Sequence, residues 1–320
     1  MSGDTTQHDA AALIERARAG ERRALARLVT CVEAGGPAAR AVTSVLHPFS
    51  GRAGLVGITG APGAGKSTLT DRLVSEVRAA GMTVGVLAVD PTSPFTGGAI
   101  LGDRVRMQEH ATDPGVYIRS MASRGHLGGL ALTTPQAARV LDALDFPWIL
   151  IETVGVGQVE VEIAGHADTT VVVLNPGWGD GVQAAKAGLL EIADVFAINK
   201  ADRAGVRETV RDVEGMLDLA GDRPWRPPVV ETVATEGTGI ESLWSAVQQH
   251  REHLVRSGEL EQRRQTRTAG EVRALVLESL GARIARRCSG PEFARLVAEV
   301  ERHERDPYGA ADALSLGVVG

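Results

Sequence analysis

The sequence predicts an α/β domain built on a mostly parallel sheet, flanked by helices and carrying helical N- and C-terminal extensions. A glycine-rich phosphate-binding motif at residues 60–67 follows a short apolar run and precedes a helical pattern. Further apolar runs of strand length lie at residues 84–89, 148–152, 193–198 and 229–232. Helical patterns alternate with these runs from about residue 54 to residue 250, an order typical of a parallel sheet covered on both faces.

The motif at residues 60–67 fits G-x-x-x-x-G-K-[ST], the phosphate loop of nucleotide-binding proteins. Its glycines let backbone N–H groups converge on phosphates, and the helix that follows adds partial positive charge. Lys66 can reach the β- and γ-phosphates, and Ser67 can supply one oxygen to Mg²⁺. A glycine-rich turn without function is the alternative. The expected nucleotide contacts are Gly60, Ala61, Pro62, Gly63, Ala64, Gly65, Lys66, Ser67 and Thr68.

A second motif indicates which base is bound. Asn199, Lys200 and Asp202 form N-K-x-D directly after the apolar run at 193–198. A carboxylate at Asp202 accepts both the N1–H and the exocyclic amine of guanine, whereas adenine has no N1–H to offer. The motif alone can also be a simple strand cap. Together with the phosphate loop it predicts GTP and GDP as ligands, and the expected base-covering loop is Val233, Ala234 and Thr235.

Carboxylates at the ends of two expected strands are candidates for Mg²⁺ contacts. Asp90 follows the apolar run at 84–89, and Asp103 lies in the loop beyond it. Glu152 ends the run at 148–152, where ligands gather in open α/β sheets. Asp90 as a turn cap and Asp103 as a solvated charge are the alternatives. With Ser67, these residues are the expected metal set.

The segment after Glu152 has the form of the D-x-x-G element, with glutamate replacing aspartate. The Gly155 amide is expected to meet the γ-phosphate. In Ras-type proteins a water-orienting glutamine follows this glycine directly. Here Val156 follows, and Gln158 comes two positions later. We therefore expect slow intrinsic hydrolysis that depends on another element or a partner.

The chain is expected to contain an N-terminal helical extension (1–50), a nucleotide-binding domain (51–257) and a C-terminal helical arm (258–320). Residues 9–33 read as one amphipathic helix, with a second helix after Pro37. The arm carries a helical apolar stripe that includes Val272, Leu275, Leu277 and Leu280. Such a stripe is buried either on a second copy, giving a homodimer, or on the chain's own core.

Composition excludes several classes of function. Thirty-four Lys and Arg face 40 Asp and Glu, a net charge of −6, with no dense basic face, which disfavours nucleic acid and anionic membrane as partners. The two cysteines form no C-x-x-C, and the eight histidines are dispersed, which argues against structural zinc or a metal store. No apolar run reaches membrane-spanning length, and a reducing cytoplasm is expected.

The phosphate loop, the glutamate element and N-K-x-D together resemble the G3E GTPases of SIMIBI type. Closer features are V-D-P-T-S at residues 89–93, G-G-A-I-L-G-D-R at 97–104, E-T-V-G-V-G-Q at 152–158 and P-G-W-G-D at 176–180. These are similar to the MeaB/ArgK family, GTPase chaperones of adenosylcobalamin-dependent methylmalonyl-CoA mutase. The resemblance implies a homodimer held partly by the C-terminal arm, and GTP-dependent loading and protection of that mutase or a related acyl-CoA mutase.

The resemblance also implies a third nucleotide-sensing loop at residues 175–186, with Lys186 serving partner-activated hydrolysis. An exposed helix lysine is the alternative for this residue. Two other functions stay open. One is a kinase of amino-acid transport proteins, which would need a base for an acceptor hydroxyl. The other is a metallochaperone GTPase, which should carry a His or Cys cluster.

Overall fold

The computed structural model describes residues 2–91, 107–110, 112–123, 133–153, 163–177, 191–221 and 223–315. Within these ranges a seven-stranded sheet has the order β3-β2-β4-β1-β5-β6-β7, and every pairing between neighbouring strands is parallel. The strands are β1 (Gly54–Gly60), β2 (Val84–Pro91), β3 (Val116–Ser123), β4 (Trp148–Thr153), β5 (Thr169–Leu174), β6 (Val195–Asn199) and β7 (Val229–Thr232). The predicted parallel α/β class is confirmed.

Alternation along the central strands divides the core between the two faces of the sheet. In β5, Val171 and Val173 pack in the core that contains α4 (Lys66–Ala79) and α10 (Ile240–Ser257). Val172 and Leu174 pack instead with α9 (Val206–Leu219). A strand buried on both faces reads as a continuous apolar run, which is why these strands carry few polar residues.

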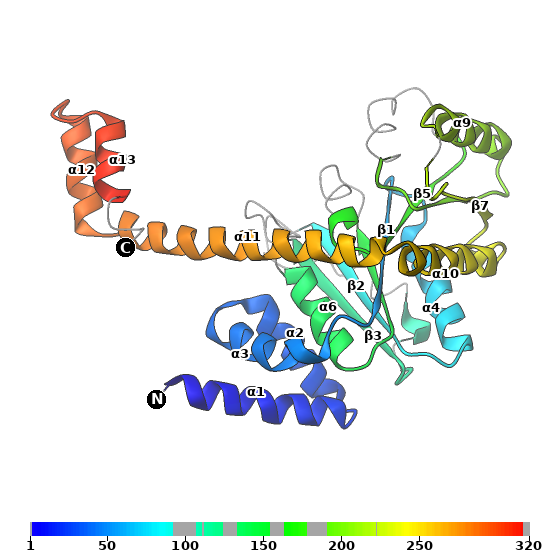
Figure 1. The fold of residues 1–320 in the computed structure, drawn as a ribbon, viewed down its shortest axis with the longest axis horizontal. Helices are drawn as coiled ribbons and strands as arrows, with labels where there is room; N and C mark the ends of the chain where they lie inside the picture. Colours follow the sequence, from blue (N-terminus) through cyan, green and yellow to red (C-terminus); the bar gives the residue numbers. More distant parts are fainter. Residues whose placement is uncertain are drawn as a thin grey trace. The chain divides into compact units, whose positions relative to one another are not determined.

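The opposite face from α4 is covered near β2 and β4 by α6 (Thr133–Ala143), and Figure 1 shows α4 and α6 on the two sides of the sheet. Three N-terminal helices pack on one another and on α6: α1 (Ser2–Arg18), α2 (Arg22–Ala34) and α3 (Gly36–Leu46). Short 3₁₀ turns lie at η1 (His47–Phe49), η2 (Gln108–His110) and η3 (Ile163–Gly165). The N-terminal helices thus extend the core of this face.

The prediction of a single helix over residues 9–33 is wrong, because α1 ends at Arg18 and α2 begins at Arg22. Gly20 adopts φ 87°, its N–H donates to Ala17 O, and the Glu21 N–H donates to Arg16 O. This pair of hydrogen bonds is the Schellman arrangement, which ends a helix at a glycine in the left-handed region. Arg16 and Glu21 also form an ion pair across the turn, at 2.6 Å.

The chain divides into two compact units, residues 1–265 and 266–320. Helix α11 (Glu259–Cys288) spans this boundary, and the second unit also contains α12 (Pro291–Glu301) and α13 (Pro307–Ser315). Within α11 and α12, several large apolar side chains are exposed: Val272, Leu275, Val276, Leu277, Ile284, Phe293 and Val297. Among the helices that the structure describes, none is long and apolar enough to cross a membrane.

Candidate nucleotide-binding site

The phosphate loop connects the carboxyl end of β1 with the first turn of α4. Lys66 and Ser67 are the first two residues of this helix, where backbone N–H groups have no partner within the helix. The Lys66 ammonium is buried within the loop and donates to Gly60 O at 2.7 Å and Ala61 O at 2.9 Å. Positive charge and the free N–H groups of a helix start therefore lie in the same loop, an arrangement that favours phosphate binding.

Two glycines of the loop are required by close approaches of the backbone. Gly60 has φ 135°, and a Cβ there would overlap the carbonyl group of Val173 in the neighbouring strand β5. Gly65 has φ 95°, and a Cβ there would overlap the side-chain amide of Asn199. Any side chain at either position would separate the phosphate loop from the strand or side chain beside it.

Two residues of the expected metal set meet at this end of the sheet. The Ser67 hydroxyl donates to Glu152 Oε1 at 2.5 Å, and both side chains are buried. Glu152 is brought there by register, because in β4 it lies opposite Ile58 of β1 and Ala88 of β2. Asp90 follows Ala88 by two positions near the end of β2, although its side chain is outside the described part. Asp103 lies outside the described residues altogether.

Asn199, the last residue of β6, joins the two loops expected to bind nucleotide. Its Nδ2 donates to Ala64 O of the phosphate loop at 2.8 Å. Its Oδ1 accepts from the Ala234 N–H at 3.1 Å and from the Thr232 hydroxyl at 3.3 Å. One buried amide therefore holds the phosphate loop against the segment that follows β7.

The rest of the N-K-x-D motif forms a turn above this amide. Lys200 adopts φ 61°, uncommon for a residue with a side chain, and its ammonium donates to Gly63 O at 2.7 Å. The Ala201 N–H donates to Thr232 O at 3.0 Å, which ties the turn to β7. Asp202 follows with an exposed side chain, open to a ligand approaching from solvent.

The expected base-covering segment is a tight turn. The Val233 N–H donates to Thr238 O at 3.0 Å, and the Glu236 N–H donates to Val233 O at 3.0 Å. A residue that sequence reasoning missed, Arg72 of α4, donates to the carbonyl oxygens of Ala234 and Thr235. An arginine in the middle of an amphipathic helix gave no local signal of that contact.

Three expected catalytic residues, Gly155, Gln158 and Lys186, lie outside the described residues. The element that leads to the first two is placed by Thr153, whose hydroxyl donates to Thr59 Oγ1 at 3.1 Å. The described residues resume at Ile163, and the range that contains β5 extends to Gly177. Only the starting points of these two loops therefore belong to the described site.

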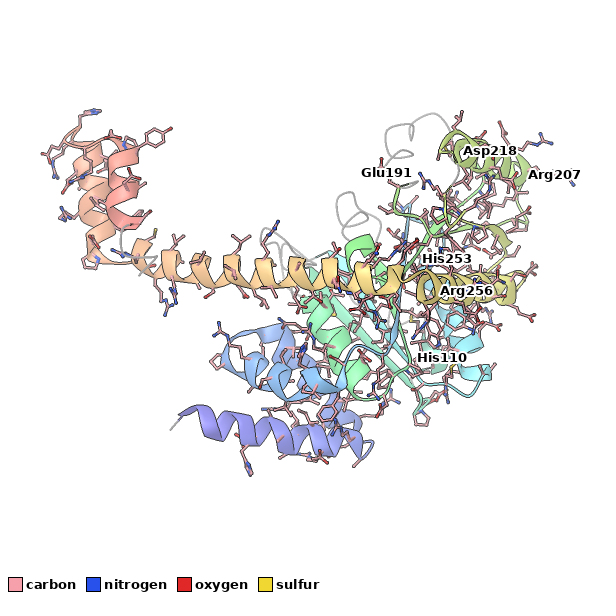
Figure 2. All side chains as sticks on the ribbon, in the orientation of Figure 1. His110, Glu191, Arg207, Asp218, His253 and Arg256 are labelled. Carbon is pink, nitrogen blue, oxygen red and sulfur yellow. The ribbon has the colours of Figure 1, made fainter. Side chains whose placement is uncertain are left out.

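A polar cluster that sequence reasoning also missed lies at the amino ends of β5 and β6, opposite the phosphate loop. Asp194 accepts from the Thr170 N–H at 2.8 Å and pairs with Arg263 of α11 at 2.9 Å. Thr169 Oγ1 lies 2.9 Å from Nδ1 of the buried His250 in α10. Burial lowers the pKa of His250 to about 4, so the ring is neutral at pH 7. His253, labelled in Figure 2, follows one turn later on α10.

Comparisons with known proteins match the chain over the residues that build this site. Residues 25–289 match the family model described as methylmalonyl Co-A mutase-associated GTPase MeaB. The chain belongs to the MeaB family. A protein of Pyrococcus abyssi called a putative GTPase is 52% identical over 312 residues, covering 96% of both chains. The Escherichia coli protein called GTPase ArgK is 37% identical over 276 residues, covering 83% of each.

A solved structure shares the fold of this MeaB family member. The crystal structure called LAO/AO transport system kinase superposes with a TM-score of 0.68 at 27% sequence identity, covering 97% of this chain and 98% of that one. The fold is therefore that of the phosphate-loop GTPases, and the resemblance expected from the sequence motifs is confirmed.

Proposed function

We propose that this MeaB family member binds and hydrolyses GTP at the carboxyl ends of β1, β4 and β6. The observation that carries the proposal is the Asn199 side chain, which joins the phosphate loop to the segment after β7 within one hydrogen-bonded unit. Phosphate and base recognition then occur at a fixed separation. Asp202 reads the N1–H and amine of guanine, and Lys200 lies across the ring.

The residues at this site fit Mg²⁺. Hard cations prefer oxygen ligands, and the Ser67 hydroxyl and Glu152 carboxylate are buried oxygen donors within hydrogen-bond distance of each other. Magnesium supplies charge neutralisation on the β- and γ-phosphates when it is bound. Ser67, Glu152 and the Asp90 position would hold the metal, and Lys66 would bind the phosphates.

Hydrolysis by the isolated chain is expected to be slow. Val156 occupies the position at which Ras-type enzymes orient water with glutamine, so turnover of about 10⁻⁴ to 10⁻² s⁻¹ is expected. Lys186 is proposed as the group that a partner brings to the γ-phosphate, with Gln158 as the alternative. A positioned donor of this kind is worth about 3–4 kcal/mol in the transition state.

The client we propose is an adenosylcobalamin-dependent acyl-CoA mutase, on the ground that the family is described by association with methylmalonyl-CoA mutase. The exposed apolar side chains of α11 and α12 support a homodimer, since a second copy would bury them. A cytoplasmic location remains the expectation for both partners. Phosphorylation of a transport protein is the competing function, because one solved relative is called a transport system kinase.

Single-turnover hydrolysis of GTP with and without a purified mutase tests this proposal. We expect GTP to outcompete ATP, and the mutase to raise the rate in the wild type but not in Lys186→Ala. Full stimulation of that variant would move the activating role to Gln158 or to the mutase. Transfer of labelled phosphate to a transport protein, with none released to water, would favour the kinase instead.

A further inference from the structure

Arg72 of α4 connects the helix that follows the phosphate loop with the expected base-covering turn. Its Nε donates to Ala234 O at 3.0 Å, and its Nη2 donates to Thr235 O at 3.1 Å. Arg72 lies six positions after Lys66, so one helix carries both a phosphate-binding group and a ligand of the turn. The guanidinium presents N–H groups on separate nitrogens in one plane, whereas the N–H groups of an ammonium all radiate from a single nitrogen.

These contacts orient one peptide group of the turn. In a trans peptide the carbonyl and the N–H point in opposite directions, and the structure contains no cis peptide among its described residues. Because the Ala234 carbonyl is directed to Arg72, the N–H of Thr235 in the same peptide plane is directed away from it. The preceding N–H, that of Ala234, is bound to Asn199 Oδ1.

Ala234 is therefore held at both of its backbone polar groups, by Asn199 through the N–H and by Arg72 through the carbonyl. Val233 and Glu236 add the internal hydrogen bonds of the turn. The backbone of residues 233–236 thus has little freedom to rotate its peptide groups. A backbone donor in a fixed direction can distinguish a carbonyl on a purine from a hydrogen at the same position.

We propose that Arg72 is a positioning residue for base selectivity: it directs the backbone N–H of Thr235 toward the 6-oxo group of guanine. This inference rests on the GTP-binding function proposed above and deepens it. Arg72 reads the base through the turn and makes no contact with it. Asp202 reads the other edge, the N1–H and the 2-amino group, so the two devices act on separate atoms of one base.

A control variant should remove an arginine from α4 without changing the turn that Arg72 holds. The same helix offers a matched comparison in Arg78, whose Nε and Nη2 donate to Asp113 at 2.8 and 3.1 Å and whose Nη1 donates to Met82 O at 2.6 Å. Arg78 anchors α4 away from the base-covering turn. Its replacement removes an arginine and several hydrogen bonds without affecting residues 233–235.

The experiment measures three dissociation constants for the full chain by calorimetry: GDP, IDP, and the diphosphate of 2-aminopurine riboside. IDP lacks the 2-amino group, and the 2-aminopurine nucleotide lacks both the 6-oxo group and the N1–H that Asp202 reads. The loss at Asp202 is common to the wild type and the variant, so the change in preference between them reports on the 6-oxo group. In Arg72→Met we expect the preference for GDP over the 2-aminopurine nucleotide to fall about tenfold, the size of one hydrogen bond. The preference for GDP over IDP should stay unchanged.

Arg78→Met should lower the unfolding temperature and leave both preferences as in the wild type. Arg72→Lys, whose single side-chain nitrogen cannot occupy both the Nε and the Nη2 positions, should recover part of the lost preference. Equal weakening of all three nucleotides in Arg72→Met, or no change in any of them, would overturn the proposal. If the wild type binds ADP as tightly as GDP, the GTP-binding function itself is contradicted.

Discussion

The Ser67 hydroxyl donates a 2.5 Å hydrogen bond to Oε1 of Glu152, between the first turn of α4 and the end of β4. These residues are 85 positions apart in sequence and are 7% and 4% exposed. A buried carboxylate is stabilised when it is hydrogen-bonded. The two oxygens therefore form one buried polar unit beside the phosphate loop, at the place where Mg²⁺ is expected.

Replacing Ser67 or Lys66 by alanine is expected to abolish tight binding of GTP·Mg²⁺ while the chain still folds. Ser67→Ala removes a metal ligand, so its GTP affinity should match that of the wild type in EDTA. Lys66→Ala removes phosphate charge, so its affinity should be low with or without metal. Calorimetry measures both, and Ser75→Ala, on the same helix, is the control. Unchanged affinity in Lys66→Ala would contradict the phosphate-loop assignment.

Asp202→Asn is expected to weaken GTP binding and to shift preference toward xanthosine triphosphate. Xanthine carries a carbonyl where guanine has its amine, and an asparagine amide can donate to that carbonyl. Competition among GTP, XTP and ATP measures the change. Asp212→Asn, an exposed carboxylate on α9, is the control and should leave the preference unaltered. The prediction fails if GTP stays preferred over XTP in Asp202→Asn by the wild-type ratio.

Gly65→Ala is expected to destabilise the chain and weaken nucleotide binding together. The new Cβ carries backbone strain at φ 95° and overlaps the Asn199 amide, so the bond from Asn199 to Ala64 O must break. Losing a buried hydrogen bond costs about 1–3 kcal/mol. Gly81→Ala is the matched control, with φ 75° and open space around its Cβ position. Urea unfolding should show a larger loss for Gly65→Ala; equal losses would mean that strain alone is responsible.

His250 is expected to make the free energy of unfolding depend on pH. Burial lowers its pKa from 6.5 to about 4. Between about pH 6.5 and pH 4 the ring therefore binds a proton in the unfolded chain but not in the folded chain. This contribution is complete above about pH 6.5 and is lost progressively toward pH 4, by at most about 3 kcal/mol.

The test compares urea unfolding of the wild type and His250→Asn at pH 7.5, 5.5 and 4.5. An asparagine side chain does not titrate, and its amide can replace His250 Nδ1 in the hydrogen bond with Thr169. The variant should lose less stability on acidification than the wild type. The exposed His303→Asn serves as the control and should follow the wild type. Identical pH dependence in all three proteins would contradict a buried neutral His250.

The sequence alone determined the parallel sheet and the phosphate loop, because each depends on neighbouring residues. The consecutive positions 60–67 specify the loop, and continuous apolar runs are sufficient to locate β1, β2, β4, β6 and β7. The same reasoning predicted Ser67, Asp90, Asp103 and Glu152 as a metal set, because ligands gather at the carboxyl edge of a parallel sheet. The structure places the Ser67 hydroxyl beside Glu152 at that edge. The helix break at Gly20 also depends on the local sequence Ala19-Gly20-Glu21. The apolar periodicity on both sides of it favoured a single helix instead.

Only the tertiary structure decided which distant side chains meet. Arg72 reaches a turn 162 positions away, and Asp194 reaches Arg263 across 69. Strand order decides the first contact, because β1 lies between β4 and β5 and so brings α4 and α10 together on one face. A pattern of hydrophobicity records which residues are buried, and it does not record what lies opposite them. The hydrogen bonds that hold the base-covering turn therefore appear only once the sheet is assembled.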